Sequence, residues 1–401
     1  MFNPFRRSAD PIVVPERKSD GAMADSGAAR PLIATQLRHG AKSTATDYAT
    51  LCREGFARNP IAHRCVRLIA ESAASVPLQT NDAQVARVLS RGLPGSSAVE
   101  TFEAFYGYLQ VGGNGFLETV LNGDAPIALV AHRPDTVHVG ANRQGGMTGW
   151  EQRVEGRRRH FPRDLSTGRC ALYHMRLFNP VDDCHGLSPL AAAAQAVDLH
   201  NRGGVWAKAL LENSARPSGA LVHAPQSGER LTDAQFERLK SELEQSFTGP
   251  HQAGRPMVLE GGLDWKSMSL SPADMDFTQL RREAAREIAL AFGVPPMLLG
   301  LPGDNSYANY REANQAFWRQ TIIPLVAKTA TGLQGWLGAF FGDDLRITPD
   351  IDKVPALAEE RAVLWKRLSD ARFITSNEAR NIAGLMTDLD CDDPVHSGVR
   401  S

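Results

Sequence analysis

Two acidic residues in the last quarter of the chain have the composition of a possible catalytic site. Asp350 and Asp352 lie in the stretch ITPDIDK, with Lys353 directly after them. Paired carboxylates can hold divalent metal ions and support phosphodiester hydrolysis. Their spacing is tight for a two-metal site, and the surrounding pattern is typical of a turn at the end of a strand. We favour the turn, and we keep a metal-dependent nuclease that uses Asp350 and Asp352 as one alternative for this chain.

Other catalytic signatures are absent or incomplete. The chain contains no GxxxxGKS or GxxxxGKT run, which a P-loop needs to surround a phosphate group. Gly112, Gly113 and Gly115 follow a helical pattern and precede a strand pattern, which reverses the order in a dinucleotide-binding fold. Ser188 lies in GLSPL, where the following proline indicates a helix N-cap and not a nucleophile elbow. We predict a protein without catalytic residues and without a cofactor.

The cysteines give no support for a metal site. They form no CxxC pair, and their odd number is typical of reduced thiols in a cytoplasmic setting. No zinc-ligand spacing occurs, so we predict no metal. No apolar run approaches the length of a membrane span, and we predict no membrane association. The cysteines are Cys52, Cys65, Cys170, Cys184 and Cys391.

The charge balance bears on nucleic-acid binding. The chain has 44 basic and 45 acidic residues, for a formal net charge of -1. A protein whose main task is to grip nucleic acid must neutralise phosphates, which this balance does not favour. A sequence-independent DNA-binding protein is a second alternative, which a steep salt dependence of affinity would identify. For the basic run Arg157, Arg158 and Arg159 we favour a solvated hairpin edge.

The most informative stretch, residues 269–341, predicts two helices joined by a loop. Ser271 is a candidate N-cap for the first helix. Leu280, Ala284, Ile288 and Phe292 recur every four residues and predict its buried face. Gly293 followed by two prolines predicts its end. The polar residues that lie mostly on its other side are Arg281, Arg282, Arg286 and Glu287.

The connecting loop is rich in turn-forming residues, which predicts an exposed segment. The second helix is expected from about Tyr310, and Pro324 inside its pattern predicts a kink. Tyr307 is the loop side chain that could reach a bulky partner. The loop residues concerned are Pro302, Gly303, Asp304, Asn305, Ser306 and Tyr307.

The rest of the chain predicts an α+β protein. A helix begins at Asn59 and Pro60, and another helical region covers residues 83–109. Short β-like runs follow between residues 113 and 179. A long helix from Ser188 to Ser214 would span roughly 40 Å.

Beyond this helix, an insertion separates it from the helix that follows Ser271. The insertion, residues 217–270, combines strands with a helix over residues 231–247. Two further helices are expected near residues 355–370 and 376–385. A capping box of Thr375 and Glu378 predicts the start of the second.

Several of these segments match one family in their literal residues. AREIALAFGVPPMLLG and NSYANYREANQAFWRQTIIPL closely resemble the portal proteins of long-tailed phages. NPIAHRCVRLIAESAASVP, GNGFLE and FNPVDDCHGLSPL match motifs of the same family, in the family's order. The resemblance covers about residues 47–390. The compact length also resembles the portals of alphaproteobacterial gene transfer agents.

The resemblance implies an α+β portal fold with an α/β wing, long stem helices, an α/β clip insertion and a small helical crown. The implied segments are a disordered N-terminal arm (1–45), wing (46–187), stem helix (188–216), clip (217–270), second stem helix (271–294), tunnel-loop region (295–309), long kinked wing helix (310–350), crown (351–390) and tail (391–401).

The resemblance also implies a function. Portals of this family form a ring, expected here as a dodecamer, at one capsid vertex of a virion or phage-like particle assembled in the bacterial cytoplasm. Double-stranded DNA passes through the channel during packaging and ejection. The implied partners are further copies of the chain, the major capsid protein, the large terminase subunit and the head–tail adaptor. By resemblance, the loop from Pro302 to Tyr307 meets the DNA, and Arg281, Arg282, Arg286 and Glu287 face the channel or neighbouring subunits.

Overall fold

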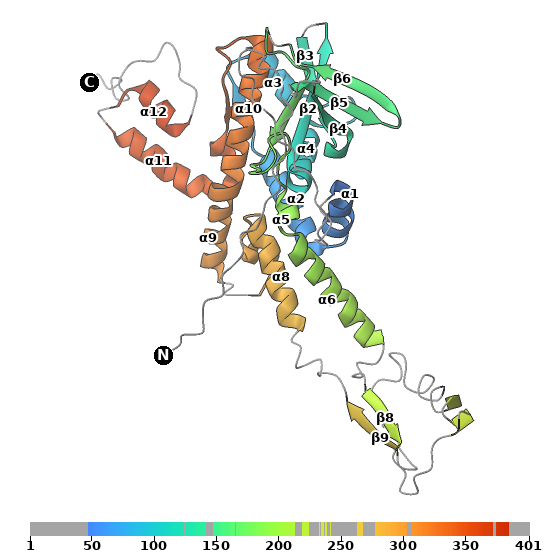
Figure 1. The fold of residues 1–401 in the computed structure, drawn as a ribbon. Helices are drawn as coiled ribbons and strands as arrows, with labels where there is room; N and C mark the ends of the chain where they lie inside the picture. The colour runs from blue at the N-terminus through green and yellow to red at the C-terminus, as the bar shows by residue number, and fades with distance from the viewer. Residues whose placement is uncertain are drawn as a thin grey trace, which may run out of the picture. The chain divides into compact units, whose positions relative to one another are not determined.

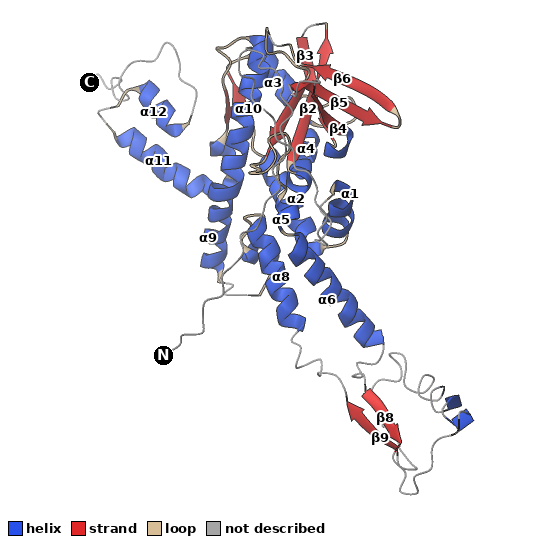
Figure 2. Cartoon of the chain, viewed as in Figure 1, coloured by secondary structure: helices blue, strands red, loops and turns tan. Residues whose placement is uncertain are grey.

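Figure 1 follows the chain through its elements, and Figure 2 separates helices from strands. The computed structural model describes residues 47–123, 125–141, 147–164, 166–212, 219–223, 263–267, 277–302, 306–371 and 374–384, with isolated positions between 232 and 241. Several predictions lie outside the described residues. They are the disordered arm at 1–45, the tail at 391–401, the Ser271 cap and most of the clip with its helix.

The first described elements are helical. α1 (Tyr48–Thr50) runs into a π-helical segment, η1 (Leu51–Ala57), and α2 (Pro60–Ala74) follows. The Asn59 side chain accepts hydrogen bonds from the backbone N–H groups of Ile61 and Ala62, at 3.1 and 3.0 Å. This N-cap confirms the predicted start of the helix.

Residues 83–109, predicted as one helical region, form two helices. α3 (Ala83–Ser90) follows the short strand β1 (Leu78–Thr80), and α4 (Ala98–Gly112) begins after a turn. The turn contains Pro94 and Gly95, which cannot readily continue a helix, and a capping box of Ser97 and Glu100 starts α4. The predicted helical region is confirmed, and these breakers divide it into two helices.

Two antiparallel sheets follow. β2 (Asn114–Asn122) lies between β3 (Ala125–His132) and β7 (Leu172–Arg176). A short 3-10 turn, η2 (Pro134–Thr136), leads into the second sheet. There β5 (Met147–Val154) lies between β4 (Val137–Ala141) and β6 (Arg157–Pro162). The β-rich region between residues 113 and 179 is therefore confirmed.

A polar network centred on the buried Glu118 joins the two sheets. Glu118 of β2 lies 2.7 Å from His132 Nε2 and 2.5 Å from an Arg159 nitrogen of β6. Gln152 of β5 lies 3.0 Å from the other ring nitrogen of His132. The predicted solvated hairpin edge fits Arg157 and Arg158, which are exposed. It misses the role of Arg159, whose guanidinium reaches back to a carboxylate from a strand far away in sequence.

The helix predicted from Ser188 onward is interrupted. α5 (Pro189–Ala192) is capped by Ser188, whose hydroxyl accepts the Ala191 N–H at 3.1 Å. Ala193 then leaves helical geometry, and α6 (Ala194–Glu212) continues. The predicted N-cap is confirmed, and the predicted long helix is broken once, at Ala193. In the predicted clip, β8 (Gly219–His223) pairs antiparallel with β9 (Leu263–Ser267).

The C-terminal half is mainly helical. α8 (Phe277–Ala291) leads through a 3-10 turn, η4 (Pro296–Leu299), to α9 (Tyr307–Phe317), the π-helical η5 (Trp318–Ile322) and α10 (Ile323–Phe341). β10 (Ile347–Pro349) pairs with β1, and 3-10 turns η6 (Ile351–Lys353) and η7 (Pro355–Leu357) precede α11 (Ala358–Asp370) and α12 (Ser376–Ala383).

Pro324 occupies the first turn of α10, directly after η5. Proline lacks the N–H that a regular helix needs, and its ring crowds the preceding turn. The sequence predicted a kink at this proline, and the structure has a π-helical segment just before it.

One large core unites α2, α4, α8 and α10. Ile69, Leu109 and Leu333 are at most 1% exposed within it. Ala284, Ile288 and Phe292 are also buried, as predicted for α8. Leu280 was predicted to be buried and is 41% exposed. In that part of α8 Arg281, and not Leu280, packs against α6.

Candidate channel and subunit-contact surfaces

The predicted stem helices α6 and α8 touch through a glycine pair. A side chain at Gly203 of α6 would place its Cβ 3.0 Å from Arg281 Cγ, and Gly204 lies beside the same guanidinium. The two glycines therefore let the aliphatic part of Arg281 lie close to the α6 backbone. Arg281 Nε is buried, and no described group accepts its hydrogen. The structure identifies these two glycines as a packing site for Arg281.

A second contact ties this helix pair to the start of α2. His200 of α6 is 7% exposed and lies 3.3 Å from the side-chain nitrogen of Asn59, the α2 N-cap. Burial, and then the nearby Arg281 cation, lower the pKa of His200. The imidazole is therefore neutral at physiological pH. Sequence reasoning missed this residue because its partners lie far away along the chain.

The four charged residues predicted on α8 have different environments. Arg286 donates to the Pro302 carbonyl at 3.0 Å and lies 3.5 Å from Glu283. Arg282 and Glu287 are exposed and form no ion pair with any described residue. Arg281 therefore packs on α6, and Arg286 binds the Pro302 carbonyl. Arg282 and Glu287 are exposed to solvent.

The predicted tunnel loop is shorter than expected. Ser306 accepts the Asn309 N–H at 3.2 Å and caps α9, so Tyr307 is the first helical residue. The helix predicted from Tyr310 starts at Tyr307, and Ser306 and Tyr307 belong to its N-terminus. Tyr307 is 82% exposed, in agreement with a side chain that reaches outward. Gly303, Asp304 and Asn305 lie outside the described residues.

The π-helical segment η5 connects the predicted stem and crown. Thr321 donates a hydrogen bond of 2.7 Å to the Gly293 carbonyl at the end of α8. Arg319 lies 3.0 Å from Glu360 of α11, and about two helical turns earlier Arg311 of α9 lies 3.6 Å from Glu359. π-helical segments inside long helices frequently occur at functional sites. Sequence reasoning located the irregularity but missed these contacts.

The two carboxylates of the nuclease alternative have structural partners. Asp350 is 5% exposed and lies 3.5 Å from Lys353. Asp352 accepts hydrogen bonds from Arg361 and Trp365 at 2.5 and 3.1 Å, and the Arg361 hydrogen bond lowers the pKa of its carboxyl group. In the part of the chain that the structure describes, no three His, Cys, Asp or Glu residues are placed to hold a metal ion. Both carboxylates thus take part in ion pairs.

Within the described ranges, no helix is long and apolar enough to cross a membrane.

The comparisons with known proteins agree on one family. The family described as "Phage portal protein" matches residues 60–384. An uncharacterized protein of Rickettsia bellii (strain RML369-C) is 37% identical over 341 residues, which cover 83% of this chain and 88% of that protein.

Solved structures extend the likeness to the fold. A chain in the virion of a native gene transfer agent particle is 44% identical with a TM-score of 0.65, over 87% of this chain and 97% of that chain. A chain in the neck of the native particle, computed with C12 symmetry, is 45% identical with a TM-score of 0.64, over 85% of this chain and 94% of that chain. The predicted fold class and family are thereby confirmed. The stretch matched by the family contains α2, α4, α8 and α10, which build the main core. The chain therefore belongs to the phage portal protein family.

Proposed function

We propose that this chain assembles into a dodecameric ring at one capsid vertex of a phage or gene-transfer-agent particle. The observation that carries the proposal is the 45% identity to a chain in a particle neck computed with C12 symmetry. A closed ring needs a heterologous interface, in which two different surfaces of each subunit meet. The exposed charges and apolar side chains of α8 are one candidate for such a surface.

The ring number is testable on purified protein. Native mass spectrometry and negative-stain images should show closed rings with a central hole. A chain that remains monomeric in mild buffer at every accessible concentration would contradict the proposal. Rings of another subunit number would revise only the stoichiometry.

The proposed ring forms the channel for packaging and ejection of double-stranded DNA. The exposed Arg282 and Glu287 and the loop between Pro302 and Tyr307 are the proposed channel or subunit contacts. Replacing residues 302–307 with a Gly-Ser linker should leave rings intact and reduce the DNA content of particles. As a matched pair, Tyr307→Ala should reduce DNA content more than Tyr310→Ala, because Tyr307 is 82% exposed and Tyr310 49%. Wild-type DNA content in the linker variant would refute the role of the loop.

Partner docking is proposed for the clip, residues 217–270. There the terminase motor would bind during packaging and the head–tail adaptor afterwards, while the major capsid protein surrounds the ring. Deleting the helix predicted at 231–247 should abolish capture of the large terminase subunit and of the adaptor. Circular dichroism should show that the rest of the subunit keeps its fold. Unchanged capture of both partners would count against the assignment.

We further propose that the chain is not an enzyme and binds free DNA weakly. The net charge of -1 provides little counterion release on a duplex. Affinity should be poor at physiological salt, and a submicromolar dissociation constant there would favour the DNA-binding alternative. Nuclease activity with Mg²⁺ or Mn²⁺ that disappears in Asp350→Asn or Asp352→Asn would favour the nuclease alternative.

A further inference from the structure

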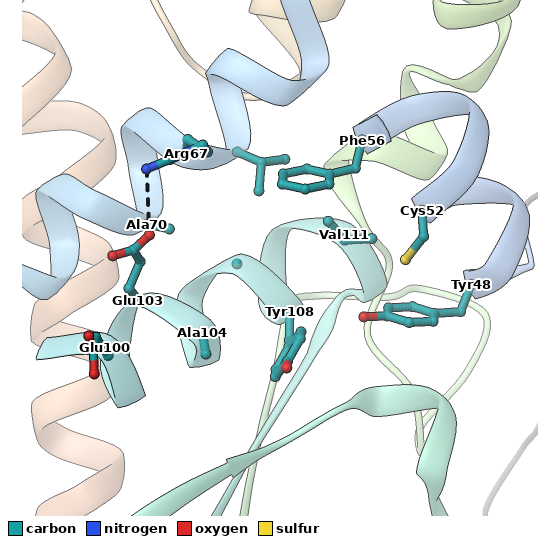
Figure 3. A pocket seen from close by; sticks show the side chains of 12 residues that line it. Tyr48, Cys52, Phe56, Arg67, Ala70, Glu100, Glu103, Ala104, Tyr108 and Val111 are labelled. Atoms are coloured by element: carbon teal, nitrogen blue, oxygen red, sulfur yellow. Dashed lines mark ion pairs between the residues drawn. The ribbon is translucent and has the colours of Figure 1, made fainter. Parts of the chain in front are cut away.

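An apolar groove lies between η1, α2 and α4 (Figure 3). Its volume is about 450 Å³, and Tyr48, Phe56 and Tyr108 contribute aromatic walls. Figure 3 shows Tyr48 and Phe56 toward one end and Glu100 and Glu103 toward the other. An apolar groove of this size that the described part of the chain leaves unfilled is a candidate contact surface.

The base of this groove is made of small residues, among them Ala70, Ala104 and Gly107. Gly107 lies inside α4, where glycine is less favourable than alanine. A Cβ at this position would meet no atom within 4 Å. The described subunit therefore does not need glycine here for its own packing, and the space above it is free for another molecule.

Three exposed apolar side chains lie on the loop between β7 and α5. Phe178 is 83% exposed, the highest value among the large hydrophobic side chains of the described residues. Val181 and Leu187 of the same loop are 55% and 44% exposed. We call these three side chains the Phe178 knob.

The loop that carries the knob is held in place by hydrogen bonds. Leu177 N–H donates to the Gly113 carbonyl at 2.9 Å, and Lys328 Nζ donates to the Arg176 carbonyl at 2.9 Å. Asn179 bridges the loop by donating to the His185 carbonyl at 2.9 Å. These bonds fix the backbone of the loop, so binding through Phe178 needs less ordering of the main chain.

Each surface carries charges of both signs: Asp182 and Asp183 lie near Phe178 together with Arg176 and Lys328, and Arg67 lies near Glu103 in the groove. Arg176 and Lys328 lie beside Phe178, and each donates to a main-chain carbonyl, which leaves its positive charge uncompensated by that bond. The acidic end of the groove carries Glu100 and Glu103, with Arg67 4.0 Å from Glu103. Asp182 of the knob loop accepts the backbone N–H groups of Cys184 and His185.

We propose that the Phe178 knob of one subunit inserts into the α2–α4 groove of the next subunit and anchors the contact that closes the ring. This inference rests on the proposed ring. A heterologous interface joins two different surfaces of each subunit, and the knob and the groove are two such surfaces. An aromatic side chain buries roughly 150–250 Å², against about 800 Å² per partner in a stable interface, so the knob is one anchor within a larger contact.

The first test blocks each surface separately. Gly107→Trp fills the groove from a position with open space, and Phe178→Ser removes the aromatic ring of the knob. Gly335→Trp is the matched control, because Gly335 also lies inside a helix and its Cβ would meet nothing within 4 Å. In native mass spectrometry, both groove and knob variants should require at least tenfold higher concentration for half-maximal assembly. The control should assemble as wild type.

The second test does not depend on assembly defects. Cys52 lines the groove and is partly exposed, so Phe178→Cys places a second thiol opposite it in the proposed contact. A short bismaleimide should link Cys52 of one subunit to position 178 of the next, and Cys52→Ser should abolish that product. Peptide mass spectrometry identifies the pair.

The outcomes separate the two proposals. Loss of assembly in both variants, together with the link between positions 52 and 178, supports the anchor. Normal rings in Gly107→Trp or Phe178→Ser, or rings without the link, overturn the anchor while the ring itself stands. Wild-type protein that never forms rings overturns both the ring and the anchor.

Discussion

The helices α2 and α8 have equal length and different surroundings. Each contains 15 residues. The cations Arg64 and Arg67 of α2 pair with Glu71 on the same helix. On α8, Arg282 and Glu287 have no ion-pair partner among the described residues, and Leu290 is 80% exposed.

This difference indicates which helix faces are packed and ion-paired within one subunit. α2 belongs to the subunit core, and its cations Arg64 and Arg67 pair with carboxylates of α2 and α4. α8 contributes Ala284, Ile288 and Ala289 to the core but leaves an opposite face that another molecule can use. One exposed leucine needs no explanation by itself. Its position beside charges that have no ion-pair partner among the described residues agrees with a subunit that functions in an assembly.

The largest expected effect tests burial. Ile69 of α2 is 1% exposed, so Ile69→Ala should lower the free energy of unfolding by about 2–5 kcal/mol. Leu290→Ala should change it by no more than about 0.5 kcal/mol, because that side chain is 80% exposed. Urea unfolding of unassembled subunits measures both. Similar losses in the two variants would mean that α8 is packed within the subunit after all.

A second prediction concerns the close approach of α6 and α8. Gly203→Leu should destabilise the subunit by about 1–3 kcal/mol, because the new side chain must displace Arg281. Gly335→Leu, where a Cβ would meet nothing within 4 Å, is the control for helix propensity. Equal unfolding midpoints for the two variants would contradict the proposed packing role of the glycine.

The helix ends provide a smaller contrast. Asn59→Ala removes the α2 N-cap and should cost about 0.5–2 kcal/mol. Thr321→Val removes the 2.7 Å hydrogen bond to the Gly293 carbonyl at the end of α8 and should cost about 0.5–1.5 kcal/mol. Thermal unfolding measures which of the two variants loses more stability. Thr321→Ser, which keeps the hydroxyl group, should restore most of the loss.

The smallest effect is a pH dependence at the junction of these helices. The pKa of His200 is lowered in the folded state, so the unfolded chain binds the proton first as pH falls. His200 therefore makes stability decline as pH drops from about 7 through its unfolded pKa of about 6.5. The nearby groups are the neutral Asn59 and the cation Arg281. In His200→Gln the decline between pH 7 and 5 should be shallower, and an unchanged slope would exclude this contribution.

The sequence by itself predicted the family, the α+β class and many helix starts. Asn59, Ser188 and Thr375 were recognised as helix starts, and each accepts the expected backbone N–H. These predictions succeed because a cap interacts with groups two or three residues away, so the necessary information is local. The segment boundaries of wing, stem, clip and crown, and the residues that face DNA, stay predictions.

The tertiary structure decided the packing contacts and ion pairs between segments that are distant in the sequence. Leu280 follows the helical period of a buried face but is exposed, because Arg281 makes the contact with α6. Arg159 belongs to a basic run yet pairs with Glu118 from another sheet. Phe178 and Gly107 attract no notice in the sequence, because the exposure of one and the open space above the other depend on where the rest of the chain folds. Periodicity and capping are properties of neighbouring residues, whereas burial and ion pairing depend on residues that only folding brings together.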